Sequence, residues 1–171
     1  AYTSSATNLN DDGAFAGSWQ ILLTDRSPDA RRTLVVSRNL STGAVGNNAS
    51  RETMLTPDGR YGVFTSSASN LVSGDTNGVE DIFFFEYDGS RIVRLERVSV
   101  GNYATQANQR SAFPSITDDG SYVAFESRAS NLVLFDRNDA NDIFIKNLST
   151  GEVLRQSATL DGQPHAGSSA R

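Results

Sequence analysis

Residues 56–83 read TPDGRYGVFTSSASNLVSGDTNGVEDIF, and residues 117–144 repeat this stretch as TDDGSYVAFESRASNLVLFDRNDANDIF. The alignment needs no gap, and 16 of its 28 positions are identical. The offset stays at 61 residues throughout, so that Tyr122 follows Tyr61 and Asp142 follows Asp81. Self-similarity at a fixed period indicates a repeat architecture in which each copy is one structural unit.

Each copy is a series of short apolar segments joined by turns. An Asp-Gly pair precedes an apolar segment at residues 58–59 and again at 119–120, which predicts a hairpin in both copies. No window keeps the apolar spacing of a helix long enough to predict one. The expected strands are 53–56, 61–66, 81–85 and 92–98 in one copy, and 113–117, 122–127, 142–145 and 153–157 in the other. The sequence therefore predicts an all-β chain with four antiparallel strands per unit.

The opening residues form a degenerate third copy. Residues 2–9 (YTSSATNL) match residues 64–71 (FTSSASNL), and residues 20–23 match residues 81–84. Four strands per unit are typical of propeller blades. The chain is therefore expected to be a single propeller segment of about two and three-quarter blades. Its predicted parts are a partial blade at 1–50 that lacks its first strand, blades at 53–98 and 114–157, and a lead-in to a further blade at 158–171.

Composition excludes several classes of protein. A chain of 171 residues is long enough to bury a core without disulfides, and it contains no Cys for a disulfide or a thiolate site. Its formal net charge of −5 argues against a nucleic-acid partner, which would favour a basic face. The longest apolar runs, such as residues 82–85, are far shorter than the roughly 18 residues of a membrane span.

The repeated pattern resembles the TolB-type β-propeller repeat. The resemblance rests on PSIxxDGxYVAFxSxASNLV followed by DxNxxxDIF, which is most complete at residues 114–144, recurs at 53–83 and is partial at 2–23. It implies a propeller whose first strand in each blade lines the central channel and whose fourth strand lies at the rim. It also implies a bacterial exported protein, and such repeats act as binding scaffolds, sometimes beside a separate catalytic domain. A closed ring needs four to eight blades, so closure requires a longer chain or partner protomers.

The repeated loop between the second and third strands carries candidate metal ligands. Carboxylate and amide oxygens on a tight loop are ligands that calcium prefers. The more economical interpretation is that these Asp and Asn side chains accept backbone N–H bonds and shape the loop. The first copy has Gln20 in place of the final Asp, so no site is expected there. The candidate ligands are Asp75, Asn77 and Asp81 in one copy and Asp136, Asn138 and Asp142 in the other.

Three further residues are candidates for contact or chemistry. Trp19, the only tryptophan, is expected to fill space between blades, or else to stack on a sugar or anchor an interface. Tyr103, in the long connection between two blades, is a better candidate than Trp19 for an exposed contact, but packing over a neighbouring blade is still somewhat favoured. His165 is the only histidine, and no GxSxG or HExxH motif accompanies it, so it is interpreted as a surface loop residue.

The sequence favours a non-catalytic binding scaffold that contacts a protein or a glycan through its blade loops. One alternative is a larger hydrolase or lyase that includes this propeller segment, and another is a structural module that calcium stabilises. The expected location is the periplasm, the cell surface or the outside of a bacterial cell. The expected assembly is a homo-oligomer or a longer chain that closes the ring.

Overall fold

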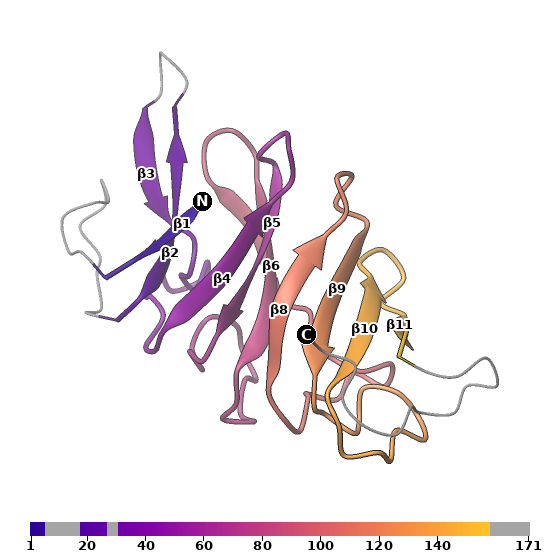
Figure 1. Cartoon of the computed structure of the whole chain (residues 1–171). Coiled ribbons are helices and arrows are strands. Elements are labelled where there is room, and N and C mark those ends of the chain that lie inside the picture. Colours follow the sequence, from indigo (N-terminus) through magenta and orange to yellow (C-terminus); the bar gives the residue numbers. More distant parts are fainter. Residues whose placement is uncertain (6–17, 27–30, 158–171) are drawn as a thin grey trace.

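The computed structural model describes residues 1–5, 18–26 and 31–157, and these residues are all-β. They form three antiparallel sheets that stand side by side in chain order (Figure 1). The first sheet consists of β1 (Tyr2–Ser4), β2 (Gln20–Asp25) and β3 (Arg32–Val35). The second consists of β4 (Ser50–Leu55), β5 (Tyr61–Ser66), β6 (Asp81–Tyr87) and β7 (Ile92–Arg97). The third consists of β8 (Ser111–Ile116), β9 (Tyr122–Ser127), β10 (Asp142–Asn147) and β11 (Val153–Arg155).

The two four-stranded sheets keep their strands in sequence order, which is the arrangement of a propeller blade. The predicted all-β fold with four antiparallel strands per blade is therefore confirmed. Within the described part of the chain, no helix has the length and apolar character to cross a membrane. The lead-in expected at residues 158–171, with His165, lies outside the described residues.

The first strands begin earlier than the apolar pattern predicted. β4 begins at Ser50 rather than at residue 53, and β8 begins at Ser111 rather than at residue 113. Both serines are buried, and each pairs its hydroxyl with a serine on the second strand, at 2.8 Å for Ser50 and Ser66 and at 3.0 Å for Ser111 and Ser127. A buried hydrogen-bonded pair of hydroxyls extends a strand without leaving an apolar signal in the sequence.

The repeated Asp-Gly turns have the same hydrogen bonds in both blades. At residues 117–122, the Gly120 N–H donates to the Thr117 carbonyl, while the Thr117 hydroxyl and the Ser121 N–H donate to Asp119. A bond from the Ser121 hydroxyl, together with those from the Thr117 hydroxyl and the Ser121 N–H, lowers the pKa of Asp119 to about 2. The turn at residues 56–61 repeats the pattern around Asp58, whose pKa is also lowered, chiefly by its bond from Thr56. The repeat therefore encodes turn chemistry as well as strand order.

The core lies between the blades, and β6 contributes to it on both faces. Phe83 and Phe85 pack toward the first sheet in a cluster that includes Ile21. Ile82 and Phe84 point the other way and pack toward the third sheet. Successive side chains on a strand point to opposite faces, so an apolar run needs a neighbour on each side. The middle blade is therefore held by its two neighbours.

Paired asparagines bind each inter-blade connection to the blade that it enters. The Asn108 N–H donates to the Asn131 side-chain oxygen at 3.0 Å, and the Asn131 amide donates to the Gln106 carbonyl at 2.8 Å. In return, the Ser130 N–H donates to the Asn108 side-chain oxygen at 3.0 Å. Asn47 and Asn70 repeat this network one blade earlier. The recurring Ser-Asn pair is thus part of the scaffold.

We expect the substitution Asn131→Ala to lower the free energy of unfolding by about 1–3 kcal/mol, because it leaves the Asn108 N–H and the Gln106 carbonyl without their partner. Denaturant unfolding monitored by circular dichroism measures this change. Ser73→Ala is the control, since Ser73 is exposed and lies on a loop of the preceding blade. Equal stability of the two variants would show that the asparagine network contributes little.

Candidate functional site

The loop between β5 and β6 brings Asp75, Asn77 and Asp81 together, as the candidate metal site required. An arginine is the fourth member of the group. Arg97, on β7, places its guanidinium 2.8 Å from Asp75 and 3.6 Å from Asp81. Asn77 donates to Asp81 at 2.8 Å and to the Ala107 carbonyl at 3.0 Å, and the Ser99 hydroxyl donates to Asp81 at 2.5 Å. The side chains of Asp75, Asp81 and Arg97 are nearly buried.

The last blade repeats this arrangement with its own arginine. Arg155, on β11, lies 2.7 Å from Asp136, and both side chains are nearly buried. The Ser157 hydroxyl donates to the buried Asp142. Asn138 accepts from the Ala140 N–H at 3.3 Å and shapes the loop. Each of the two blades therefore contains a buried network of acid, arginine and serine at the same place.

Burial and the arginines act in opposite directions on these carboxyl groups. Burial is the larger effect, and it raises the pKa of Asp75, Asp81 and Asp136 above the ordinary value. The guanidinium of Arg97 opposes this shift at Asp75 and Asp81, and that of Arg155 does so at Asp136. The arginine is thus the main compensation for Asp75 and Asp136, whereas at Asp81 the hydrogen bonds from Ser99 and Asn77 lower the pKa more than Arg97 does.

The first blade has lost both charges at this place. Gln20 takes the position of Asp81, and Val35 takes that of Arg97, because Leu22 pairs with Val35 as Phe83 pairs with Arg97. The Gln20 amide donates to the Gly46 carbonyl at 3.1 Å, and its oxygen accepts from the Ser37 hydroxyl at 2.6 Å. Gln20 thus accepts a serine hydrogen bond as Asp81 does in the next blade, and as a neutral residue it needs no cation beside it. Acid and arginine have been lost together.

Arg97 bears directly on the predicted calcium site. The guanidinium of Arg97 lies against Asp75 and Asp81, which is where a bound cation would have to lie. Among the described residues, no group of three Asp, Glu, His or Cys side chains is placed to hold a metal ion. The oxygen donors present therefore do not fit calcium unless Arg97 is displaced. Calcium binding here stays a prediction, and a melting temperature that rises with calcium and falls with chelator would establish it.

The exposed aromatic residues differ from the packing that the sequence favoured. Trp19 is 56% exposed, so the expectation that it fills the space between blades is wrong. Tyr103 is 69% exposed and does not pack over the neighbouring blade. Leu134 and Phe135 are also well exposed, at 59% and 72%, and the sequence analysis did not select them. Large apolar side chains on loops are a signal for contact with a partner.

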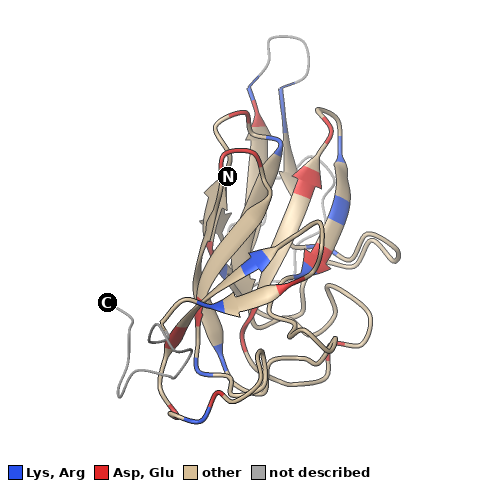
Figure 2. Cartoon of the chain, turned by 90° about the vertical axis from the view of Figure 1, so that its right-hand side faces the viewer, with Lys and Arg blue, Asp and Glu red and all other residues tan. Residues whose placement is uncertain are grey.

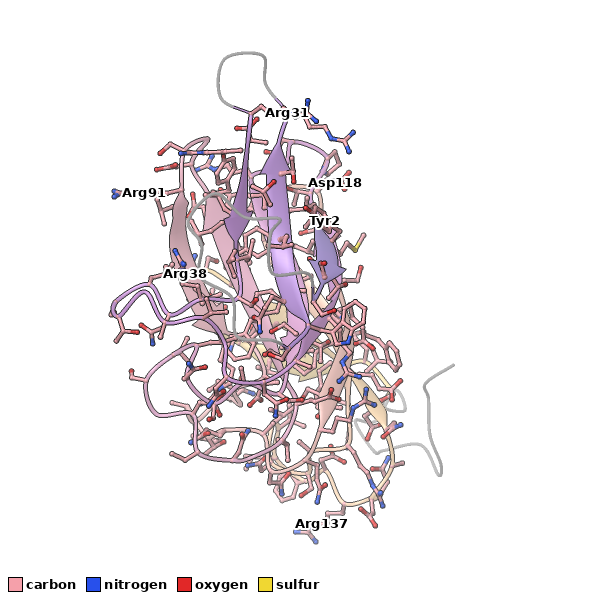
Figure 3. The ribbon with its side chains drawn as sticks, turned by 90° about the vertical axis from the view of Figure 1, so that its left-hand side faces the viewer. Tyr2, Arg31, Arg38, Arg91, Asp118 and Arg137 are labelled. Carbon is pink, nitrogen blue, oxygen red and sulfur yellow. The ribbon has the colours of Figure 1, made fainter. Side chains whose placement is uncertain are left out.

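The loop tip formed by Leu134 and Phe135 carries an unusual backbone. Phe135 has a φ of +65°, and its counterpart in the preceding blade is Gly74, with a φ of +72°. Left-handed backbone suits glycine and is strained for a bulky residue. Arg137 lies over the Phe135 ring at 5.7 Å, and Figure 3 shows Arg137 at the lower extremity of the molecule. Comparing the two repeats by residue size would have revealed this tip, because Ser73 and Gly74 occupy the same positions.

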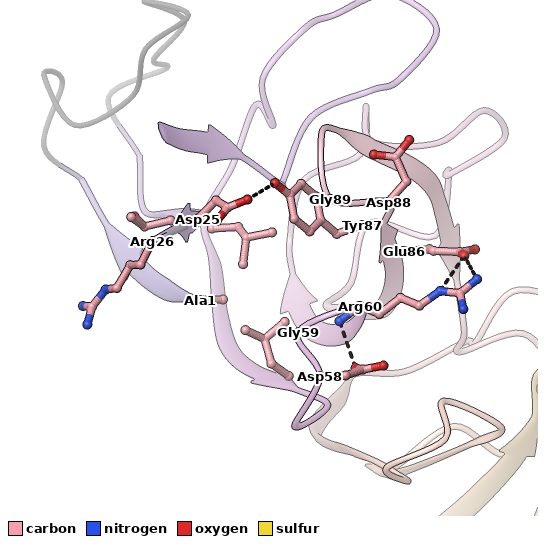
Figure 4. Close-up of a pocket in the computed structure, with 13 residues that line it drawn as sticks. Ala1, Asp25, Arg26, Asp58, Gly59, Arg60, Glu86, Tyr87, Asp88 and Gly89 are labelled. Atoms are coloured by element: carbon pink, nitrogen blue, oxygen red, sulfur yellow. Dashed lines mark hydrogen bonds and ion pairs between the residues drawn. The ribbon is translucent and has the colours of Figure 1, made fainter. Parts of the chain in front are cut away.

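A cavity of about 750 Å³ lies between the first and second sheets (Figure 4). Two pairs of its polar side chains are bonded to each other. The Tyr87 hydroxyl donates to Asp25 at 2.8 Å, and Arg60 lies 2.9 Å from Glu86. At the equivalent turn between the second and third sheets, the Tyr61 ring packs against Gly120, whereas a Cβ added at Gly59 would meet no described atom within 4 Å.

Comparison with known proteins gives structural similarity alone. No protein-family model matches the chain, and no curated protein matches it in sequence. The structure is similar to that of a TolB protein from Agrobacterium tumefaciens, with 20% identity and a TM-score of 0.47 over 84% of this chain and 42% of that one. It is also similar to Kuenenia stuttgartiensis hydrazine synthase, with 17% identity and a TM-score of 0.42 over 89% of this chain and 41% of that one. The chain thus spans about two fifths of each, and the blade assignment rests on the sheets described above.

We expect the substitution Arg97→Val to cost about 3–5 kcal/mol of stability, because it leaves two buried carboxylates without a counter-charge. The triple variant D75N/D81Q/R97V, which introduces the neutral residues Gln and Val of the first blade, should recover most of this loss.

Because burial raises the pKa of both carboxyl groups, the folded state binds their protons more tightly than the unfolded state. The deficit of Arg97→Val should therefore shrink as the pH falls through the folded-state pKa values.

The control for this series is Arg94→Val on the same strand. Arg94 pairs with Glu96 at 2.8 Å, and both side chains are more than a third exposed. Exposed pairs contribute about 0–1 kcal/mol, so the control should change stability little. If both valine variants unfold at the same denaturant concentration, the buried network has no special role in stability.

Proposed function

We propose that this chain is a non-catalytic binding scaffold that contacts a protein or a glycan through the blade loops at one end of the sheets. The observation that carries the proposal is the contrast between two sets of side chains on those loops. The acids of the repeated motif, Asp75, Asp81 and Asp136, are turned inward and bonded to arginine or serine side chains. The large apolar side chains of Tyr103, Leu134 and Phe135 face outward. Such loops on a rigid scaffold are suited to recognition.

The charges of the described residues support a partner other than nucleic acid. Arg and Lys are interspersed with Asp and Glu over the strands and loops in view (Figure 2). A phosphate-backbone partner would instead favour a basic stripe. Aromatic and arginine side chains together, as at Phe135 and Arg137, are enriched at protein contacts. We place the scaffold in the bacterial periplasm, on the cell surface or outside the cell, which is where repeats like that at residues 114–144 occur.

The test uses two sets of probes, an array of bacterial polysaccharides and a displayed library of random peptides. We expect binding to members of one set without turnover, and binding about tenfold or more weaker for the double variant L134S/F135G, in line with the loss of a contact hot spot. The matched control is Val93→Ser, which removes an exposed apolar side chain from β7, away from the loops. Turnover of a polysaccharide or peptide would instead favour the hydrolase or lyase alternative.

A further inference from the structure

The two junctions between blades differ at equivalent positions of the repeat. Between the connection that follows the first sheet and the second blade lies a pocket of about 350 Å³, here called the junction pocket. Its apolar lining comes from Leu40, Leu71, Val72 and Leu95, and all of its lining residues are uncharged. Its size falls within the range of about 300–1,000 Å³ that is usual for ligand pockets.

The connection beside the junction pocket lacks two hydrogen bonds that its counterpart at the next junction makes. At the next junction, the Asn102 amide donates to the Val153 carbonyl at 2.9 Å, and its oxygen accepts from the Val153 N–H at 2.6 Å. The equivalent residues are Leu40 and Leu95, where Leu95 pairs with Phe85 as Val153 pairs with Lys146. Leucine cannot make the two amide bonds, and Leu40 stays 43% exposed.

At the second junction, the positions equivalent to the small residues of the junction pocket carry large apolar side chains. Where the junction pocket has the small residues Ser41 and Ser73, the second junction has Tyr103 and Leu134. Phe135 follows Leu134 at a position where the preceding blade has glycine. The tip side chains are apolar and project, while the pocket is apolar and hollow. One chain therefore carries both halves of a complementary contact.

The tip and the junction pocket lie at the same end of the sheets. The tip is on the loop from β9 to β10, and part of the pocket is on the equivalent loop from β5 to β6, both at the lower end in Figure 1. Two copies that meet through this end can each insert their tip into the pocket of the other. A two-fold axis then relates the two contacts and closes the assembly.

We propose that the loop tip, Leu134 and Phe135, docks into the junction pocket of a second copy of this chain. This inference rests on the proposed function, since it names a partner for the same loops. The uncharged pocket suits the apolar tip, and burying Phe135 offsets part of the backbone strain at its left-handed position. Arg137 remains at the rim, stacked on the ring.

Two variants separate the halves of the contact. L134S/F135G gives the tip the two residues of the preceding blade, and Gly at a φ of +65° also relieves strain, so the fold should persist with an unchanged or higher melting temperature. L40N introduces the side chain of Asn102 at the equivalent place, which removes an apolar residue from the pocket lining and offers the Leu95 backbone the two bonds that Asn102 makes to Val153. Val93→Ser again serves as the control for the loss of an exposed apolar residue.

The measurement is the molar mass in solution by light scattering over a range of concentrations. We expect the wild-type chain and Val93→Ser to dimerise, and L134S/F135G and L40N each to dissociate at protein concentrations about tenfold or more higher. A mixture of L134S/F135G with L40N should associate again, because one intact tip meets one intact pocket. A monomeric wild-type chain, or dimers of unchanged strength in both variants, would overturn the proposal.

The same variants separate this inference from the proposed function. If the wild-type chain is monomeric while L134S/F135G still loses a peptide or glycan, the tip binds another partner and only self-docking is wrong. If the chain dimerises through the tip but binds neither probe set, self-docking stands and the scaffold role for other partners fails. Loss of folding, detected by circular dichroism, would identify a variant unfit for either comparison, and the second variant then decides the outcome.

Discussion

The structure depends on the need to cover both faces of a sheet. β6 carries phenylalanine on each face, so the second sheet is stable only with a neighbour on either side. This constraint places the hydrophobic core between the blades and sets their order. The connections between the sheets are fastened by asparagines, whose side-chain amides bond backbone groups of the connection.

The fold was largely predictable because its determinants are local. Asp-Gly turns and alternating apolar runs are short-range signals, and the repeat supplied a second reading of each. The beginnings of β4 and β8 were missed because buried serines hold them, and hydroxyl pairs leave no apolar pattern. The exposure of Trp19 and Tyr103 was also missed, because the types of these residues fit a core as well as a surface.

The candidate site was predicted in part. Asp75, Asn77 and Asp81 do come together, but the cation near them is a side chain. Arg97 and Arg155 lie beyond the strictly periodic stretch, after turns of different length, so a fixed offset of 61 does not align them. The strand registers, which place each arginine beside its phenylalanine, recover the correspondence. The joint absence of acid and arginine in the first blade therefore becomes visible only with the strand registers.

That paired loss bears on how the repeats diverged. If a lone buried charge is costly, then neither the acid nor the arginine can change first without a penalty, and the two positions evolve as an epistatic unit. A duplicated blade starts with redundant neighbours, which lend it enough stability to pass through the unfavourable intermediate. The first blade then carries the neutral pair, Gln20 and Val35, while the other two blades carry an aspartate and an arginine at these positions. Sequence drift among such blades should therefore proceed in coupled steps at the buried network and freely at the loop tips.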